Sequence, residues 1–393
     1  MKKILFICLV FVFIVFGIFI LADDSDSDTA IGEFSDLIFK DELEEYNNDF
    51  EINRLKLKNQ SFYYNSLSSE NKKIYTAIAN GIKKFNKSIA LKEYEIIDND
   101  TTMSDIDKSM QAFFADHPEV FYVSSKYTVL TKTTAFNEYV ELELEYTLSN
   151  SSELDTKISE IENKINEYIE YTKGKDDFES ELILHDMLGK NVKYYEYNDV
   201  ELVPQECHTI YGAFLSNQSV CDGFSKALQI LLDRKGIESI IVFGNLENEA
   251  HAWNLVNLNN SWYHLDLTSD KSIKDISENI VLHTYFNLTT NAIKGTHTID
   301  SEEILPISNN EEYNYYIKKN KVLKFEDVFM KKFKSLLDNN ENQYLLEFSS
   351  SDVDDVPEQM VKFLSRNQYT DYISNNKITY YNILNTYVLM KNK

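Results

Sequence analysis

The segment Val220-Cys-Asp-Gly-Phe-Ser-Lys-Ala-Leu228 places a cysteine at the start of an apolar helical pattern. Apolar side chains recur at the spacing of one helix face at Phe224, Ala227, Leu228, Leu231 and Leu232. Gly236 suits the end of this helix, and residues 237–243 form an apolar run typical of a buried strand. Cys221 is therefore predicted at a helix N-terminus, where the helix dipole and the first amide groups favour a thiolate and can hold an oxyanion.

A hairpin carrying a histidine and an aspartate is predicted after this helix. Its two strands are residues 251–258 and 262–268. Asn259 and Asn260 lie between them, and asparagine tolerates the left-handed backbone of a tight turn. If these two form the loop, His251 pairs with Thr268, and Asp266 lies diagonal to His251 on the same face, roughly 7–8 Å away between backbones. A loop one residue longer would turn Asp266 to the opposite face, so an even-length loop or a compensating bulge is required.

These residues predict acyl transfer through a thioester, because a thiol nucleophile needs a base and a group that orients the base. Cys221 would attack a carbonyl carbon, and His251 would take the thiol proton and later protonate the leaving group. Asp266 would hold the imidazole tautomer and stabilise the imidazolium. Trp253 and Trp262, on the same strands, are predicted to be core residues. Neither a cofactor nor a metal ion is expected.

Four segments together resemble the core of the bacterial transglutaminase-like superfamily: Tyr211-Gly-Ala-Phe-Leu215, Val220-Cys-Asp-Gly-Phe-Ser-Lys-Ala227, His251-Ala-Trp-Asn-Leu-Val256 and Trp262-Tyr-His-Leu-Asp-Leu-Thr268. The resemblance extends upstream through His185-Asp-Met-Leu188, under a third of the chain in all. It implies an α+β, papain-like fold in which the helix with the cysteine packs on an antiparallel sheet. It also implies that Cys221, His251 and Asp266 occupy the family's nucleophile, base and orienting positions.

Two features depart from the family pattern or leave it incomplete. The family often has a tryptophan after the Asp-x-Thr step, where this chain has Ser269, and this puts packing rather than chemistry in question. No residue is identified as the side-chain contributor to the oxyanion site. Gln205, Tyr211 and Gln218 are the candidates, and each is expected to be structural.

The composition excludes several classes of protein. A chain of 393 residues is too long for one ordinary core, so two or more domains are expected. The formal net charge is −25, which repels phosphate backbones and argues against nucleic-acid binding. Apolar residues make up 43% of the chain, enough for a packed globule. Disulfide scaffolds use more cysteines than the three present here.

The N-terminus has the pattern of an export signal. Lysines at positions 2–3 precede an uncharged apolar run over residues 4–21, which just reaches the ~18 residues that span a bilayer. Cleavage near Ala22 would place Ile20 where a small residue is wanted, so an uncleaved anchor is favoured over a cleaved peptide. The flanking charges predict a cell-membrane protein with an extracellular body, or a secreted protein if the segment is removed.

The other cysteines and histidines are given structural interpretations. Cys8 lies within the apolar run and is interpreted as a bystander. Cys207 could form a bridge with Cys221, which would block attack, but a reduced pair is favoured. His208, beside Cys207, lacks a second ligand pair at metal spacing. His264 is predicted on the same face of the hairpin as His251. It is nevertheless expected to be a surface or core histidine whose hydrogen bonds are satisfied.

Five segments are predicted along the chain: 1–22 (signal anchor or signal peptide), 23–40 (acidic tether), 41–173 (α+β N-terminal domain), 174–300 (transglutaminase-like catalytic domain) and 301–393 (small α+β C-terminal extension). Helices are predicted at 67–85, 182–192 and 326–337, and from a capping box at Asn150 and Glu153. Strands are predicted at 120–123, 137–148, 342–349 and 377–390.

Three functions remain open. The first is a transferase that passes an acyl group from a glutamine carboxamide to an amine, and the second is a cysteine peptidase or amidase with water as the acceptor. The third is a binding or structural module built on an inactive core. The first two act on a protein or peptide substrate and share every catalytic residue. Membrane contact is expected through the N-terminal segment alone, and the oligomeric state is left open.

Overall fold

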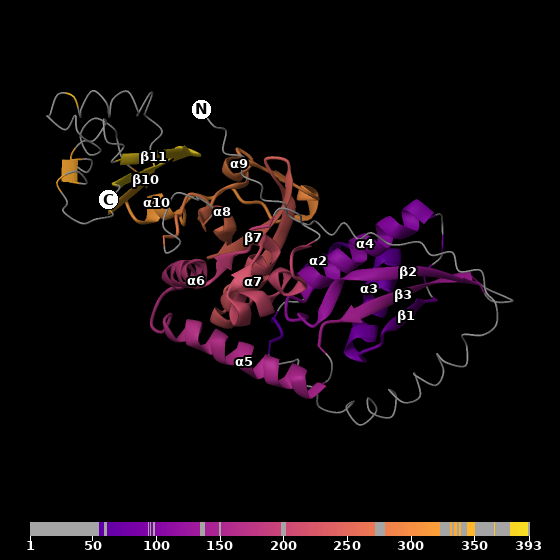
Figure 1. Ribbon diagram of the computed structural model, residues 1–393. Coiled ribbons are helices and arrows are strands. Elements are labelled where there is room, and N and C mark those ends of the chain that lie inside the picture. Colours follow the sequence, from indigo (N-terminus) through magenta and orange to yellow (C-terminus); the bar gives the residue numbers. More distant parts are fainter. Residues whose placement is uncertain are drawn as a thin grey trace. The chain divides into compact units, whose positions relative to one another are not determined.

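The computed structural model describes most of residues 55–391 (Figure 1). Outside the description are residues 1–54, 59–60, 93, 95, 97–98, 134–137, 149–150, 198–201, 272–279, 392–393, and most of 323–343 and 350–377. The predicted signal segment, the acidic tether, the cap at Asn150 and most of the predicted helix 326–337 therefore lie outside the described residues. Within the described part, no helix combines the length and apolar character that membrane crossing requires.

Chain contacts divide the protein into two compact units. The first unit runs to Leu255 and includes Ile299–Leu305, and the second comprises Val256–Thr298 and Pro306–Lys393. Each unit combines helices with antiparallel strands, as expected for an α+β protein. The five segments predicted from the sequence stay a prediction.

The first unit opens with an α+β layer. Its elements are α2 (Phe62–Ser66), α3 (Ser69–Lys83), β1 (Ser88–Leu91), α4 (Asn99–Asp116), β2 (Val123–Thr133) and β3 (Glu138–Tyr146). The strands form an antiparallel sheet in the order β1-β3-β2, and α3 packs on both α4 and β1 (Figure 1). On β3, which lies within the strand predicted at 137–148, Val140, Leu142 and Leu144 are buried while Glu143 and Glu145 are exposed.

Local caps set the helix boundaries. The hydroxyl of Ser68 accepts a hydrogen bond from the Asn71 amide and caps the start of α3, within the range predicted for this helix. The helix predicted from residue 182 begins earlier, at Asp177, because Asp176 caps it by accepting from the Glu179 amide at 2.8 Å. The strand predicted at 120–123 is wrong for its first three residues, because a turn at Pro118 and Glu119, closed by the Val120 amide on the His117 carbonyl, follows α4 and β2 begins only at Val123.

Helices and a sheet around the cysteine complete the first unit. They are α5 (Ser151–Glu170), α6 (Asp177–Asn191), β4 (Lys193–Tyr194), the 3-10 turn η3 (Gln205–His208), the π-turn η4 (Gly212–Ser216), β5 (Gln218–Ser219), α7 (Cys221–Lys235), β6 (Ser239–Leu246) and most of β7 (Glu249–Leu258). Both α5 and α6 pack against α7, and α7 packs against β6. The helix with the cysteine is therefore enclosed by other elements of its own unit.

The second unit holds the end of the hairpin and the C-terminal sheet. Its elements are β8 (Ser261–Leu265), α8 (Leu267–Lys271), α9 (Thr290–Ile293), most of β9 (His297–Ile299), α10 (Tyr315–Lys318), β10 (Tyr344–Ser349), β11 (Ile378–Ile383) and β12 (Thr386–Lys391), while η5 (Glu302–Ile304) returns to the first unit. The last three form an antiparallel sheet in the order β10-β12-β11. The single strand predicted at 377–390 is thus a hairpin, which turns at Leu384 and Asn385 with positive φ.

Candidate active site

Cys221 is the first residue of α7, as predicted. Gly236 ends the helix in the left-handed conformation, with φ 91°, which glycine adopts without steric cost. The Cys221 side chain has 0% exposure and shares an apolar cluster with Ala252 and Phe243. The thiol therefore lies at a helix N-terminus inside the first unit rather than on its surface.

Gly223 lets a neighbouring turn press against the start of α7. A side chain at this position would collide with the hydroxyl of Ser219 and the carbonyl oxygen of Cys207. The Val220 amide also donates to the Cys207 carbonyl at 3.0 Å. The glycine two residues after Cys221 is thus explained by close backbone approach, which holds the helix start against η3.

An ionic network lies directly beside the cysteine. The imidazole Nδ1 of His208 lies 3.0 Å from one oxygen of Asp222, and the Lys226 ammonium lies 3.5 Å from the other. The Gly223 amide also donates to the Asp222 carboxylate at 3.0 Å. Burial alone would raise the pKa of Asp222, but His208, Lys226 and these hydrogen bonds outweigh it and lower the pKa. The contact of His208 with Asp222 was not predicted from the sequence.

Ser225 ties α7 to the strand that carries His251. Its hydroxyl lies 2.8 Å from the Cys221 carbonyl oxygen and 3.0 Å from that of Ala252. The Asn254 amide group donates to the Ser225 carbonyl at 3.0 Å. One helical turn after the cysteine, α7 is therefore bonded to β7 at Ala252 and Asn254, the residues on either side of Trp253. Ala252 is also the residue next to His251.

His251 lies on β7 and is 1% exposed. Its imidazole stacks on the ring of Trp253, with centroids 5.9 Å apart and an interplanar angle of 22°. Trp253 is buried, as predicted for a core residue, while Trp262 is half-buried. The described structure thus places Cys221 and His251 in one unit, on a helix and a strand bonded to each other.

The turn after β7 has the even number of residues that the sequence analysis required. β7 ends at Leu258 and β8 begins at Ser261, so the loop has two residues, Asn259 and Asn260, with φ 51° and 62°. Positive φ at both positions is typical of a type I′ hairpin turn. The predicted pairing of His251 with Thr268 is wrong, however, because β8 ends at Leu265 and Thr268 belongs to α8.

Asp266 lies in the second unit, between the end of β8 and the start of α8. Its side chain accepts a hydrogen bond from the Ser269 amide at 3.1 Å, the geometry of a helix N-cap. The Ser269 hydroxyl bonds the second carboxylate oxygen. Ser269, noted in the sequence as a packing difference, therefore contacts the predicted orienting carboxylate directly.

Sequence reasoning missed His297, which also bonds Asp266. The imidazole Nε2 of His297 lies 3.1 Å from the Asp266 carboxylate, and both side chains have 0% exposure. The two residues are 31 positions apart, and His297 is outside every motif quoted above. A short alternation around β9 was the only local signal, and it predicts a strand rather than a contact with Asp266.

A tyrosine from α2 covers the cluster around the thiol. The ring of Tyr63 packs against the cluster of Cys221, with its centroid 6.0 Å from that of Phe243, and its hydroxyl bonds the Ile241 carbonyl. Asp116, at the end of α4, accepts from the Tyr63 amide at 3.0 Å and so holds α2 in place. Burial and the carboxylates of Asp116 and Asp300 raise the pKa of Tyr63, so its phenol stays a neutral donor.

The predicted oxyanion candidates have other described contacts. Gln205 accepts a hydrogen bond from Ser125 at 3.0 Å, and the ring of Tyr211 lies 6.1 Å from that of Phe121. Gln218 is exposed on β5. The contacts of Gln205 and Tyr211 are with the N-terminal α+β layer, so the structural interpretation is favoured for both.

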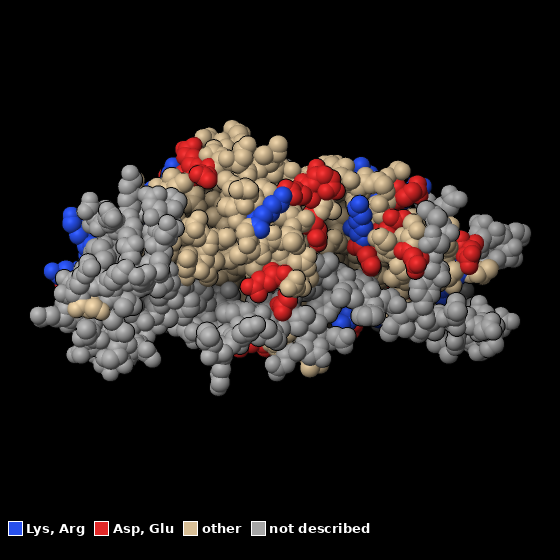
Figure 2. All heavy atoms as spheres, turned by 90° about the horizontal axis from the view of Figure 1, so that it is seen from above, with Lys and Arg blue, Asp and Glu red and all other residues tan. Residues whose placement is uncertain are grey.

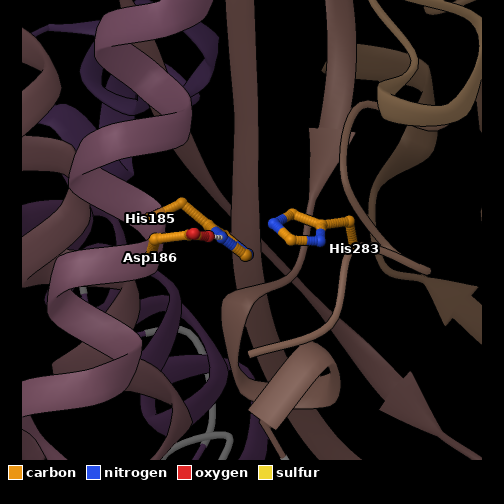
Figure 3. Close-up of side chains that lie close together, drawn as sticks. All are labelled: His185, Asp186 and His283. Atoms are coloured by element: carbon orange, nitrogen blue, oxygen red, sulfur yellow. Dashed lines mark hydrogen bonds and ion pairs between the residues drawn. The ribbon is translucent and has the colours of Figure 1, made fainter. Parts of the chain in front are cut away.

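The remaining histidines have local partners. Figure 3 shows His185 and Asp186 projecting from α6, where the imidazole Nδ1 lies 3.2 Å from the carboxylate. In the second unit, the imidazole of His283 bonds Glu347 at 3.0 Å. His264 bonds the Thr290 hydroxyl at 3.1 Å, and burial with nearby positive charge lowers its pKa to about 3. His264 is therefore a neutral, satisfied histidine, as expected from the sequence.

Cys207 differs chemically from Cys221. The structure holds both as thiols without a disulfide, and both are buried. Burial and the carboxylates of Glu206 and Asp222 raise the pKa of Cys207 to about 12. Its thiol is therefore protonated and unreactive at neutral pH. Acidic side chains gather in several clusters on the face shown in Figure 2, consistent with the net charge of −25.

Comparison with known proteins gives one family match. The model of the transglutaminase-like superfamily matches residues 141–267, about a third of the chain. This segment contains Cys221, His251 and Asp266. No curated protein matches the chain.

Three solved structures show limited similarity. A transglutaminase structure is 12% identical, with 40% of this chain and 47% of that chain covered and a TM-score of 0.28. A proposed cysteine protease from Cytophaga hutchinsonii is 13% identical, with coverages of 37% and 63% and a TM-score of 0.24. A proposed protease from Parabacteroides distasonis is 11% identical, with coverages of 36% and 36% and a TM-score of 0.23. The chain thus spans about half the length of the first of these, and overlaps of this size carry no argument about chemistry.

The family match agrees with the α+β fold and with a cysteine at the start of a helix that is bonded to a neighbouring strand. Residues 141–267 therefore form a domain of the transglutaminase-like type.

Proposed function

We propose that this chain is a thiol acyltransferase or hydrolase of the transglutaminase-like type, acting on protein or peptide amides through a thioester on Cys221. The observation that carries the proposal is the position of the Ser225 hydroxyl, which shares its one proton between the Cys221 and Ala252 carbonyl oxygens at 2.8 and 3.0 Å. It holds the first turn of the cysteine helix against the strand position next to His251. A thiol and an imidazole on elements fixed in this way are the first two members of a nucleophilic triad.

The proposed reaction follows from the chemistry of these side chains. The imidazole of His251 takes the Cys221 proton, and the thiolate attacks the amide carbonyl carbon. The first-turn amides of α7 stabilise the tetrahedral oxyanion, since a helix N-terminus presents donors and a positive dipole end. The imidazolium protonates the leaving amine, and an acceptor then releases the acyl group from sulfur. Asp266 is proposed to orient the imidazole, and the two-residue hairpin loop supports this role.

The acceptor of the acyl group decides which reaction occurs: an amine gives transfer, and water gives hydrolysis. Complete burial of Cys221 favours an acyl site that excludes water, which supports transfer. A binding module on an inactive core is the alternative, and it predicts that the thiol forms no acyl intermediate.

The experiment that tests the proposal is acyl-enzyme trapping. The full chain is incubated with glutamine-containing peptide libraries, with and without a primary amine, and intact and peptide masses are measured. An acyl adduct on Cys221 that disappears in Cys221→Ala is expected, and amine-linked products would identify transfer. A folded wild-type protein that forms no adduct across the libraries, while Cys221→Ala behaves identically, would favour the binding module.

The cellular location is a further part of the proposal. The charged and apolar pattern of residues 1–22 supports anchoring in the cell membrane with an extracellular body. Protein or peptide substrates at the cell envelope would then be within reach. Membrane fractionation of cells that express the full chain, compared with a variant lacking residues 1–22, tests this, and equal recovery in the soluble fraction would overturn it.

A further inference from the structure

The carboxylate of Asp266 accepts hydrogen bonds from two elements of the second unit. On one side, the Ser269 amide donates to Oδ1 at 3.1 Å, and the Ser269 hydroxyl bonds Oδ2. On the other, the His297 imidazole Nε2 lies 3.1 Å from Oδ2. α8 and β9 therefore fix both oxygens, and rotation of the carboxylate is restrained.

The hydrogen bonds also define the tautomer of His297. An ionised carboxylate accepts hydrogen bonds and donates none, so Nε2 of His297 must carry the proton that points at Asp266. The other ring nitrogen, Nδ1, lies 2.9 Å from the Thr296 hydroxyl, which donates to it in the neutral imidazole. The ring of Tyr285 meets the imidazole edge-on, with centroids 5.4 Å apart. The ring of His297 is thus held at both nitrogens and is in contact with the ring of Tyr285.

The bonds from Ser269 and His297 are all donated to oxygens of the Asp266 carboxylate. Their hydrogen bonds stabilise the charged form of the carboxylate, which is the form that an orienting group must keep.

We propose that His297 is a positioning residue for the reaction: together with Ser269, it holds the Asp266 carboxylate ionised and aimed at the catalytic imidazole. The inference rests on the proposed function, since it acts through Asp266. It assigns a role to a residue 46 positions after His251, outside the region matched by the family model. His297 does not touch the substrate in this proposal.

The experiment measures the pH dependence of Cys221 alkylation by iodoacetamide in the full chain, so it needs no identified substrate. Peptide mapping assigns the label to Cys221 rather than to Cys207. An oriented imidazole keeps the thiol ionised below the free-thiol range of about 8.5, so the wild-type rate persists at pH 6. His297→Leu removes the donor, and His297→Gln restores an N–H at the end of its side chain.

We expect His297→Leu to lower the alkylation rate at pH 6 about tenfold, the scale of losing a hydrogen bond to a charged group, and to move the profile to higher pH. His297→Gln should recover most of the rate. His264→Gln is the matched control, because it changes a buried histidine of the same unit that bonds Thr290. It should leave the profile unchanged. Thermal unfolding of each variant shows whether it is folded.

Two results would overturn the inference. A folded His297→Leu protein with the wild-type profile would remove His297 from the mechanism, and equal shifts in His297→Leu and His264→Gln would show a structural effect alone. Asp266→Asn separates this failure from failure of the proposed function. If its profile shifts while that of His297→Leu does not, only the positioning role is wrong. If neither His251→Ala nor Asp266→Asn changes the wild-type profile, the triad itself is wrong.

Discussion

The imidazole of His208 lies 3.0 Å from the carboxylate of Asp222, the residue that follows Cys221. His208 is half-buried and Asp222 is buried, and together with Lys226 they hold the turn that precedes α7 against the start of the helix. Because the network contacts the first turn of α7, the charge state of Asp222 affects how the cysteine is held.

The first prediction concerns stability in acid. The pKa of Asp222 is lower in the folded chain, so the unfolded carboxyl binds protons more readily. The contribution of the Asp222 carboxylate to folding stability is complete above the unfolded-state pKa of about 3.9. It is lost as the pH falls through the lower pKa of the folded state. We expect Asp222→Asn to weaken the dependence of Tm on pH below about pH 4. Exposed Asp177→Asn is the control, and an unchanged slope in Asp222→Asn would contradict the assignment.

The second prediction concerns access to the thiol. Tyr63 covers the cluster around Cys221 and is held by Ile241 and Asp116. Tyr63→Ala should increase the rate of Cys221 alkylation at neutral pH by about tenfold, because it removes the ring and one hydrogen bond to a buried carbonyl. Tyr64→Ala is the matched control, since that ring packs on Tyr75, with centroids 5.0 Å apart. Equal rates in both variants would show that α2 does not restrict access.

The third prediction tests close packing at the helix start. Gly223→Ala places a methyl group against the Ser219 hydroxyl and the Cys207 carbonyl, and overpacking of this kind destabilises by about 1–3 kcal/mol. Urea denaturation should show this loss. The double variant Ser219→Ala/Gly223→Ala should recover little, because the backbone carbonyl remains in place. Full recovery would mean that the side chain of Ser219 alone restricts this position.

The fourth prediction separates orientation from binding. Asp266→Asn keeps an oxygen for the Ser269 amide but loses the charge that favours imidazolium. Once a substrate is known, kcat should fall by about a hundredfold or more while KM changes little. Asp270→Asn is the control, because Asp270 is a buried carboxylate of the same helix that accepts from the Tyr285 amide at 2.9 Å. Equal losses of kcat in the two variants would remove the special role of Asp266.

The fifth prediction concerns the C-terminal sheet. Glu347 on β10 accepts from the His283 amide at 2.7 Å and from the Tyr316 hydroxyl at 2.6 Å, and all three groups are buried. Glu347→Ala leaves these donors unsatisfied and should lower the local free energy of unfolding by about 2–4 kcal/mol. Hydrogen exchange in β10 measures this. Glu347→Gln, which keeps an acceptor, should lose less, and equal losses would point to packing alone.

The features predicted correctly from the sequence depend on local spacing. The apolar period after Cys221 and the glycine at position 236 define α7, and two adjacent asparagines define the hairpin loop. Such signals act over a few residues, where backbone preference and side-chain periodicity decide the outcome. The early end of β8 was missed because the N-cap at Asp266 competes with strand pairing, and the pairing pattern alone does not show this.

The contacts that surround the thiol and the carboxylate were missed for another reason. Tyr63 and Ile241 are separated by 178 positions, and Asp266 and His297 by 31. No periodic pattern connects residues at such separations, because tertiary packing alone brings them together. His208 and Asp222 are only 14 positions apart, but the intervening π-turn and two-residue strand carry no readable period.

The complete burial of Cys221 also affects how readily its thiol is oxidised. A thiolate in contact with an oxidising medium is converted to sulfenic acid and then to irreversible higher oxides. The sulfur atom shares an apolar cluster with Phe243 and Ala252, and Tyr63 packs against this cluster, so peroxide in the medium reaches it more slowly than it would reach an exposed thiol. In the extracellular location proposed above, burial of this kind would protect the proposed nucleophile from oxidation.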